Sequence, residues 1–221
     1  MHKLQSLLDE SAAHHNHLCP RQVLGVRMGL LGGQVLGIDV PQTAKRMFVF
    51  VELDGCGMGG IATATGCFVR RRTMRVLDFG KLAATFVDME NGRSVRIHPH
   101  PQNREYAIAA LPDEPDHWQR QLAAYQFLPD EQLFIVEAVE LTVSMEKIIS
   151  QPGLRVLCAQ CGEEISNERQ VVENGRILCR ACAGATYYRS QRQSADMAQF
   201  KPAYAINGRS NLVHTNHFDY R

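Results

Sequence analysis

Apolar residues recur at helical spacing over the first part of the chain, interrupted by one polar cluster. Residues 4–12 predict an amphipathic helix, which gives way to the polar run 14–17. A second helix is expected to begin at Pro20, because proline suits the first helical position, with Cys19 as its N-cap. Its continuation over residues 23–35 mixes aliphatic residues with glycines, each of which costs about 1 kcal/mol relative to alanine. The glycines therefore predict that another backbone packs closely against this helix.

The centre of the chain alternates between short apolar runs and turns, which is typical of strands. The Asn91-Gly92 pair supplies the positive φ values of a tight hairpin, so the strands around it are expected to be antiparallel. The pattern predicts an α+β fold with a mixed, largely antiparallel sheet and packed helices. The expected strands cover residues 47–53, 74–77, 82–87, 94–97 and 133–143, and the expected helices between them cover residues 56–66, 105–111 and 118–125.

The domain organisation follows from a break in this pattern at Gln151-Pro152-Gly153. We expect a core over residues 1–150 and a small cysteine-rich module over residues 151–186. Residues 187–221 have no periodicity and few aliphatic residues, so we expect a tail that is partly disordered or packed on a partner.

Charge and composition exclude several classes of protein. The chain has 24 Lys+Arg against 23 Asp+Glu, a net charge of +1, and 21% charged residues. It is therefore neither a basic protein that coats nucleic acid nor an acidic disordered one, and nucleic acid is not an expected partner. No stretch reaches the roughly 20 apolar residues that cross a bilayer, and the first ten residues do not read as a secretion signal. We expect a soluble, cytoplasmic protein without a membrane partner.

Cysteine placement carries the first chemical signal. Seven cysteines is an odd number, and without a secretion signal metal binding is expected over disulfides. Two CxxC pairs, separated by 17 residues, fall within zinc-ribbon spacing and predict a zinc site in a small treble-clef or ribbon-like domain. A rubredoxin-like iron site is the alternative. The predicted ligands are Cys158, Cys161, Cys179 and Cys182.

A second group of ligand-type residues lies near the start of the chain. His15, His17 and Cys19 fall within five residues, ahead of the second helix. An N-cap cysteine is exposed to the helix dipole and to free amide groups, which favour the thiolate that binds metals or attacks electrophiles. We therefore expect a transition-metal site in the core, with Cys56 or Cys67 as further members. Cys19 is also the candidate nucleophile.

A rival interpretation concerns the glycine-rich segment at residues 55–60. It fits GxGxxG after an apolar run and before a helix, and Asp78 stands roughly where a ribose-binding acid would lie. Against a dinucleotide site, the helix is short, Arg70–Arg72 interrupt the unit, and an Asn-Gly hairpin follows in place of further parallel crossovers. The cationic turn formed by these arginines keeps an anion-binding role open, although an arginine run is more often a solvated face.

Several short motifs follow one another along the chain: His15, His17, Cys19-Pro20, Cys56, Thr65-Gly66-Cys67 and Asp78-Phe79-Gly80-Lys81, with a CxxC-CxxC finger at the end. Taken in order, these motifs resemble those of the FmdE family, which is associated with molybdenum or tungsten formylmethanofuran dehydrogenase and many of whose members end in such a finger. This chain departs from the family pattern at Gly59-Gly60 and at Arg70–Thr73. The resemblance implies an α+β core that dimerises, a metal near the histidine-cysteine motif, and an accessory role rather than formylmethanofuran oxidation.

From these observations we predict a metal-binding accessory protein that supports a metalloenzyme or its maturation machinery. It is expected to hold zinc and a second transition metal in the core. The alternatives are a metal- or cysteine-dependent enzyme acting on a small anionic substrate, and a zinc-finger interaction or nucleic-acid-binding protein. The helix glycines, the tail and the family resemblance together predict a homodimer.

Overall fold

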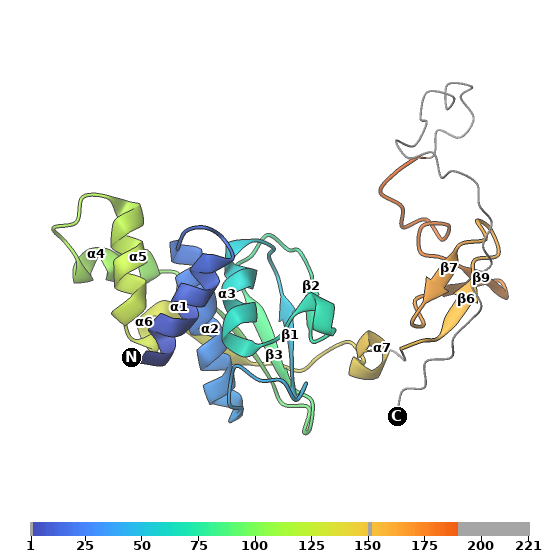
Figure 1. Cartoon of the computed structure of the whole chain (residues 1–221), viewed down its shortest axis with the longest axis horizontal. Helices are drawn as coiled ribbons and strands as arrows, with labels where there is room; N and C mark the ends of the chain where they lie inside the picture. Colours follow the sequence, from blue (N-terminus) through green and yellow to red (C-terminus); the bar gives the residue numbers. More distant parts are fainter. Residues whose placement is uncertain (1, 150–151, 190–221) are drawn as a thin grey trace, which may run out of the picture. The chain divides into compact units, whose positions relative to one another are not determined.

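The structure is a computed structural model that describes residues 2–149 and 152–189 (Figure 1). The chain divides into two units, Met1–Ile149 and Ser150–Arg221, and each is described by itself. The expected tail falls almost wholly on residues 190–221, which lie outside the described residues. Among the helices described, none combines the length and the apolar character that a membrane span requires.

A five-stranded mixed sheet forms the centre of the first unit, in the order β2-β1-β3-β4-β5. The β1–β2 pair is parallel and the other pairs are antiparallel, so the predicted α+β class with a mixed, largely antiparallel sheet is confirmed. The strands are β1 (Met47–Val51), β2 (Met74–Val76), β3 (Ala84–Asp88), β4 (Ser94–Pro99) and β5 (Phe134–Ala138).

The longer helices of this unit match the expected pattern, while the shortest ones have no periodic signal in the sequence. Pro20 opens α2, and the backbone N–H of its N-cap Cys19 donates to Gln22 Oε1 at 2.8 Å. Gly37, with φ of 70°, ends this helix. The helices are α1 (His2–Ala13), α2 (Pro20–Leu36), α3 (Cys56–Thr65), α4 (Asn103–Ala110), α5 (His117–Phe127), α6 (Asp130–Leu133) and α7 (Met145–Ile149), with a 3-10 turn η1 (Val69–Arg71).

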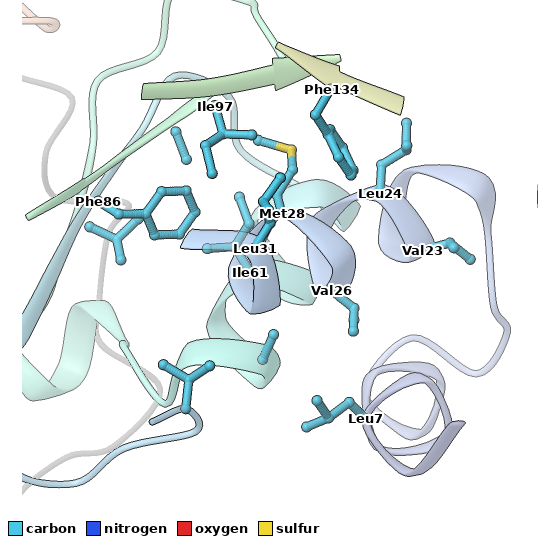
Figure 2. Packing of buried hydrophobic residues seen from close by; sticks show 14 of the residues in the cluster. Leu7, Val23, Leu24, Val26, Met28, Leu31, Ile61, Phe86, Ile97 and Phe134 are labelled. Carbon is cyan, nitrogen blue, oxygen red and sulfur yellow. The ribbon is translucent and has the colours of Figure 1, made fainter. Parts of the chain in front are cut away.

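The two faces of the sheet are covered differently. On one face, Val49 of β1 and Phe86 of β3 belong to a large apolar core shared with α1, α2, α3 and α5. Figure 2 shows Met28 and Leu31 of α2 in this core, on the same side as Phe86. On the other face, a smaller cluster centred on Phe48 and Phe50 is covered by partly buried residues of the segment 141–148.

That second cluster explains the strand that differs most from expectation. The sequence pattern predicts a last strand over residues 133–143, but β5 ends at Ala138. The chain then leaves the sheet, and its apolar residues Leu141 and Met145 cover the Phe48–Phe50 face. The alternation that predicts a longer strand therefore reflects burial against the face of the sheet.

Helices α2 and α3 pack with their backbones almost in contact. A Cβ atom on Gly25 would lie 2.2 Å from the carbonyl oxygen of Gly57, and one on Gly60 would lie 2.5 Å from the carbonyl oxygen of Gln22. Neither backbone group can yield as a flexible side chain would, so only glycine fits at these two positions. The predicted close approach exists, and the partner backbone belongs to the same chain.

An ion pair organises the turn between β3 and β4. The Asp88 side chain is fully buried and accepts hydrogen bonds from Arg46 at 3.0 Å and from Asn91 at 2.9 Å. Its Oδ1 also accepts from the backbone N–H of Glu90 at 3.0 Å. The hydrogen bond from Arg46 is the main reason that the pKa of Asp88 lies below its ordinary value of 3.8.

The second unit is built from two short antiparallel hairpins. The pairs are β6 (Arg155–Leu157) with β7 (Glu164–Ser166), and β8 (Val171–Glu173) with β9 (Arg176–Leu178). Asn174 and Gly175 both have positive φ, as the predicted Asn-Gly turn requires. The buried apolar cluster consists of Cys158, Ile165 and Leu178 alone among the residues described here, too few for a core of ordinary size.

We expect Gly25→Ala to destabilise the first unit by about 1–3 kcal/mol or more, because the added methyl group would overlap the Gly57 carbonyl. In a helix without such a contact, the same change would increase the free energy of unfolding by about 1 kcal/mol. Ala123→Gly, at an exposed position of α5, measures the effect of helix propensity alone. It should lower the free energy of unfolding by about 1 kcal/mol. Urea denaturation measures both variants, and a Gly25→Ala protein as stable as the parent would contradict the close backbone contact.

We expect Asp88→Asn to lower the melting temperature at pH 7, because Arg46 loses its ionised partner. Since the folded pKa of Asp88 is lowered, its contribution is present above pH 3.8 and is lost as the pH falls through the lowered value. The gap between parent and variant should therefore narrow below pH 3.8. Thermal scans across pH measure this, with Asp113→Asn, on an exposed residue, as the matched control. A gap that does not depend on pH would show that the ion pair contributes nothing.

Candidate functional site

The close packing of α2 and α3 brings the starts of the two helices together. Cys19 is the N-cap of α2, and Cys56 is the first residue of α3. Cys19 is 8% exposed and Cys56 is half-buried. The pKa of the Cys56 thiol is raised, first by burial and then by the neighbouring Cys19 side chain. Two thiols at two helix N-termini therefore lie near each other at the edge of the core.

An imidazole approaches the same helix from the turn after α1. A Cβ on Gly59 of α3 would lie 2.8 Å from the Nε2 atom of His15, so this glycine leaves the space in which the half-buried ring lies. His17 is on the same turn but is exposed. The structure therefore brings His15 to the first turn of α3, which carries Cys56, and leaves His17 in solvent.

Cys67 lies elsewhere. It follows the C-terminal end of α3, is fully buried, and donates from Sγ to the carbonyl oxygen of Met47 at 3.3 Å. Its sulfur also accepts a hydrogen bond from Gln42 Nε2 at 3.6 Å. Burial raises the pKa of this thiol. Cys56, and not Cys67, is thus the cysteine that accompanies Cys19.

The glycine-rich segment and the arginine run have structural roles. Gly57 and Gly60 meet α2, and Asp78 accepts a hydrogen bond from the Gly80 N–H at 3.0 Å inside its own turn. Arg71 donates to the carbonyl oxygens of Gln42, Thr43 and Gly66, so its guanidinium joins the segment after α2 to the end of α3. These contacts account for the motif without a nucleotide.

A cavity that no sequence motif predicts opens beside Cys19. Its volume is about 540 Å³, and its wall includes Arg21, Arg104 and Trp118. Arg21 also lies near enough to Cys56 to lower its pKa slightly against the larger effect of burial. The sequence gives no sign of this cavity because α4 and α5, which contribute to it, lie far downstream of Cys19 in the chain.

The four C-terminal cysteines come together in the second unit. Their sulfur atoms all lie within 4.8 Å of one another, and within the described part of the chain no other group of three or more histidine, cysteine and acidic side chains is arranged to hold a metal. The residues are Cys158, Cys161, Cys179 and Cys182. Four thiolates at this spacing fit a tetrahedral zinc ion.

Backbone amides prepare this cluster for ligation. Hydrogen bonds from the amides of Cys161 and Cys179 lower the pKa of Cys158 to about 6, so this sulfur is largely thiolate at neutral pH. The neighbouring Cys179 sulfur is the largest cause that raises the pKa of Cys182, to about 12. Four sulfurs this close cannot all ionise without a cation, which is the expected electrostatics of a metal-binding site.

The chain is similar to known proteins over both of its units. A family model described as "FmdE, Molybdenum formylmethanofuran dehydrogenase operon" matches residues 14–135. A second model, "Prokaryotic dksA/traR C4-type zinc finger", matches residues 152–188. The first match contains His15, Cys19 and Cys56, and the second contains the four clustered cysteines.

One curated relative and one solved structure extend the comparison. A "Probable S-adenosyl-L-methionine-binding protein" of Archaeoglobus fulgidus is 29% identical, over 84% of this chain and 54% of the relative. The chain thus spans about half the length of that relative. The crystal structure of an FmdE-like protein of the tungsten formylmethanofuran dehydrogenase type, from Syntrophus aciditrophicus, has a TM-score of 0.54 at 18% identity, covering 84% of this chain and 95% of the other. This likeness shows a shared fold.

Proposed function

The chain belongs to the FmdE family, and on that premise we propose that it is a metal-binding accessory protein that supports a metalloenzyme. A metal-binding role is given by the family together with the four-cysteine cluster. The accessory role, the residues that hold each metal and a second metal are our proposal. The observation that supports it is that Cys19 and Cys56 lie near each other at two helix N-termini of the first unit. Neither residue belongs to the four-cysteine cluster.

In the proposed arrangement the second unit holds a structural zinc ion. Cys158, Cys161, Cys179 and Cys182 supply all four ligands, so no position is left for a substrate. Since the buried apolar cluster of this unit is small, the metal replaces most of the stabilisation that a core would give.

The core site would be of the open type. The Cys19 and Cys56 thiols offer two soft donors, which favour zinc, copper, nickel or iron over magnesium or calcium. His15 at the first turn of α3 is the candidate third donor, and its imidazole would have to move to complete the site, because the three side chains do not form a ligand group as the structure describes them. A site with three protein ligands leaves a coordination position for an exchangeable group, as transfer or supply of a metal requires. The chain would bind such an ion and present it to a partner metalloenzyme.

A metal- or cysteine-dependent enzyme on a small anionic substrate is the second candidate. The cavity beside Cys19 favours it, because arginines line the wall that a substrate would touch. S-adenosyl-L-methionine, named for the relative, carries a cationic sulfonium and an ammonium group beside its carboxylate. A wall with arginines and without a carboxylate does not favour that ligand.

The homodimer also stays a proposal, supported by the family resemblance. The glycines of α2 meet α3, the sheet and the segment 38–40 of the same chain, so they give no evidence for a second copy.

We expect Cys179→Ser to remove about one zinc ion per chain and to unfold the second unit, because the binding energy there is folding energy. The thermal transition of the first unit should persist. Elemental analysis gives the zinc content, and hydrogen exchange over residues 152–189 reports the folding of the unit. Ser166→Ala, at an exposed position of strand β7, is the matched control and should keep its zinc. Full zinc content in Cys179→Ser would reject the four-cysteine site.

We expect Cys19→Ser and Cys56→Ser each to remove a further metal ion from anaerobically purified protein while the zinc of the second unit stays bound. Each change deletes one of the two thiols that the structure brings together, so metal affinity should fall by at least the roughly tenfold that loss of an outer-shell partner costs. Cys67→Ala is the control: it should lower stability, because the side chain is buried, and leave the metal count unchanged. One metal ion per chain in both parent and variants would overturn the core metal site and, with it, the proposed accessory role.

A further inference from the structure

Two cavities of the first unit share part of their lining beside the start of α2, and we refer to them together as the groove. Their volumes are about 540 and 370 Å³, and both are lined by Pro20, Arg21, Arg104 and Gln121. Cavities of this size match those that hold small molecules. Each compartment therefore has room for a small ligand beside the residues that the two share.

The groove carries two guanidinium groups, those of Arg21 and Arg104, that pair with no carboxylate among the described residues. Arg120, the third arginine of the wall, lies near the Asp116 carboxylate. Arg21, Arg104 and Arg120 line it, and neither cavity has an aspartate or glutamate in its wall. Arg120 is held in place by donating to the carbonyl oxygens of Leu111 and Glu114. Across residues 2–149 as described, Arg21 and Arg104 form no ion pair, in contrast to Arg27, whose guanidinium is 2.6 Å from Asp130.

The helix geometry adds to this charge. Pro20 and Arg21 are the first residues of α2, a helix of 17 residues, so the free N–H groups of its first turn add partial positive charge near the wall that both compartments share. Arg104 lies beside Tyr125, whose pKa is raised by burial and partly lowered again by that guanidinium. An anion between Arg21 and Arg104 would meet two guanidinium groups that no carboxylate of the described chain neutralises.

The first cavity also has an apolar wall. Trp118 is 39% exposed and Ile108 is 50% exposed, although both belong to helices that pack on the unit. An exposed indole next to guanidinium groups offers a flat surface to a planar ligand body. The wall thus matches the two halves of an amphipathic small molecule.

We infer that this groove binds a small organic anion, with its phosphate or carboxylate between Arg21 and Arg104 and a planar apolar body against Trp118. Arginine pairs with both oxyanions in a forked geometry, so the two share one recognition chemistry. Cys19 lines the first cavity, which places the ligand next to the proposed metal site. The inference goes beyond metal binding, because no residue that would hold the anion is a proposed metal ligand.

Trp118 makes the inference directly testable, because it is the only tryptophan of the chain. The full-length protein is titrated with phenyl phosphate, benzoate and phenol, followed by tryptophan fluorescence and by calorimetry in parallel. Phenyl phosphate, benzoate or both should bind with a change in emission, and phenol should bind at least about tenfold more weakly because it lacks the charge. Comparison of the first two ligands separates a phosphate site from a carboxylate site. Neither heat nor fluorescence change at millimolar phenyl phosphate and benzoate would overturn the proposal.

Arginine variants locate the binding. Arg104→Gln and Arg21→Gln, both on exposed side chains, should each raise the dissociation constant of the better-bound anion about tenfold. Arg70→Gln removes the same charge from a residue that stacks on Phe68 outside the groove, and should leave binding unchanged. An equal loss in all three variants would show non-specific charge attraction and overturn the assignment.

Metal analysis of the same samples keeps the two proposals apart. Arg104→Gln should retain the metal content of the parent, and the Cys19→Ser protein should still bind the anion through its arginines. If the core metal is absent but the anion still binds, the anion site is supported and only the core metal site is rejected. If the anion does not bind, the anion site is rejected and the metal measurements still decide the metal sites.

Discussion

The approach of the α2 and α3 backbones is the contact on which the rest of the first unit depends. Gly25 and Gly60 allow each helix to lie against the carbonyl groups of the other. Because α3 connects the parallel strands β1 and β2, its position relative to the sheet is fixed. The contact with α3 then fixes the position of α2. Cys19 and Cys56 lie near each other as a consequence of this contact. A larger residue at either glycine would separate the helices and the thiols together.

The two units are stabilised by different means. The first buries a continuous apolar cluster between the sheet and its helices, which suffices for a unit of this length. The second buries few apolar side chains, and its four sulfurs repel one another as thiolates unless a cation lies between them. We therefore expect folding of the second unit to depend on a metal ion, whereas folding of the first depends on packing.

Two sets of arginines in the first unit have contrasting environments. Arg27, Arg46 and Arg96 each pair with a carboxylate and join segments that are distant in sequence. Arg21 and Arg104 have no such partner among the residues described, although acidic residues are nearly as frequent in the chain as basic ones. Charges left unpaired in a concave wall do not stabilise the fold, and this is the physical reason to look for a ligand there.

The sequence by itself determined the elements and the chemistry that depends on local spacing. Periodicity marked α1 and α2, proline and Cys19 marked the start of α2, and two CxxC pairs marked the metal cluster, since helix caps and paired thiolates need only neighbours in the chain. The same reasoning could not choose between Cys56 and Cys67, which begin and follow one short helix. Only the tertiary structure showed that Cys56 lies near Cys19 and that the glycines allow a contact between helices. It also showed that residues of α4 and α5 line a basic groove. These outcomes depend on which surfaces pack together over long sequence separations, and a one-dimensional pattern of residues does not record that.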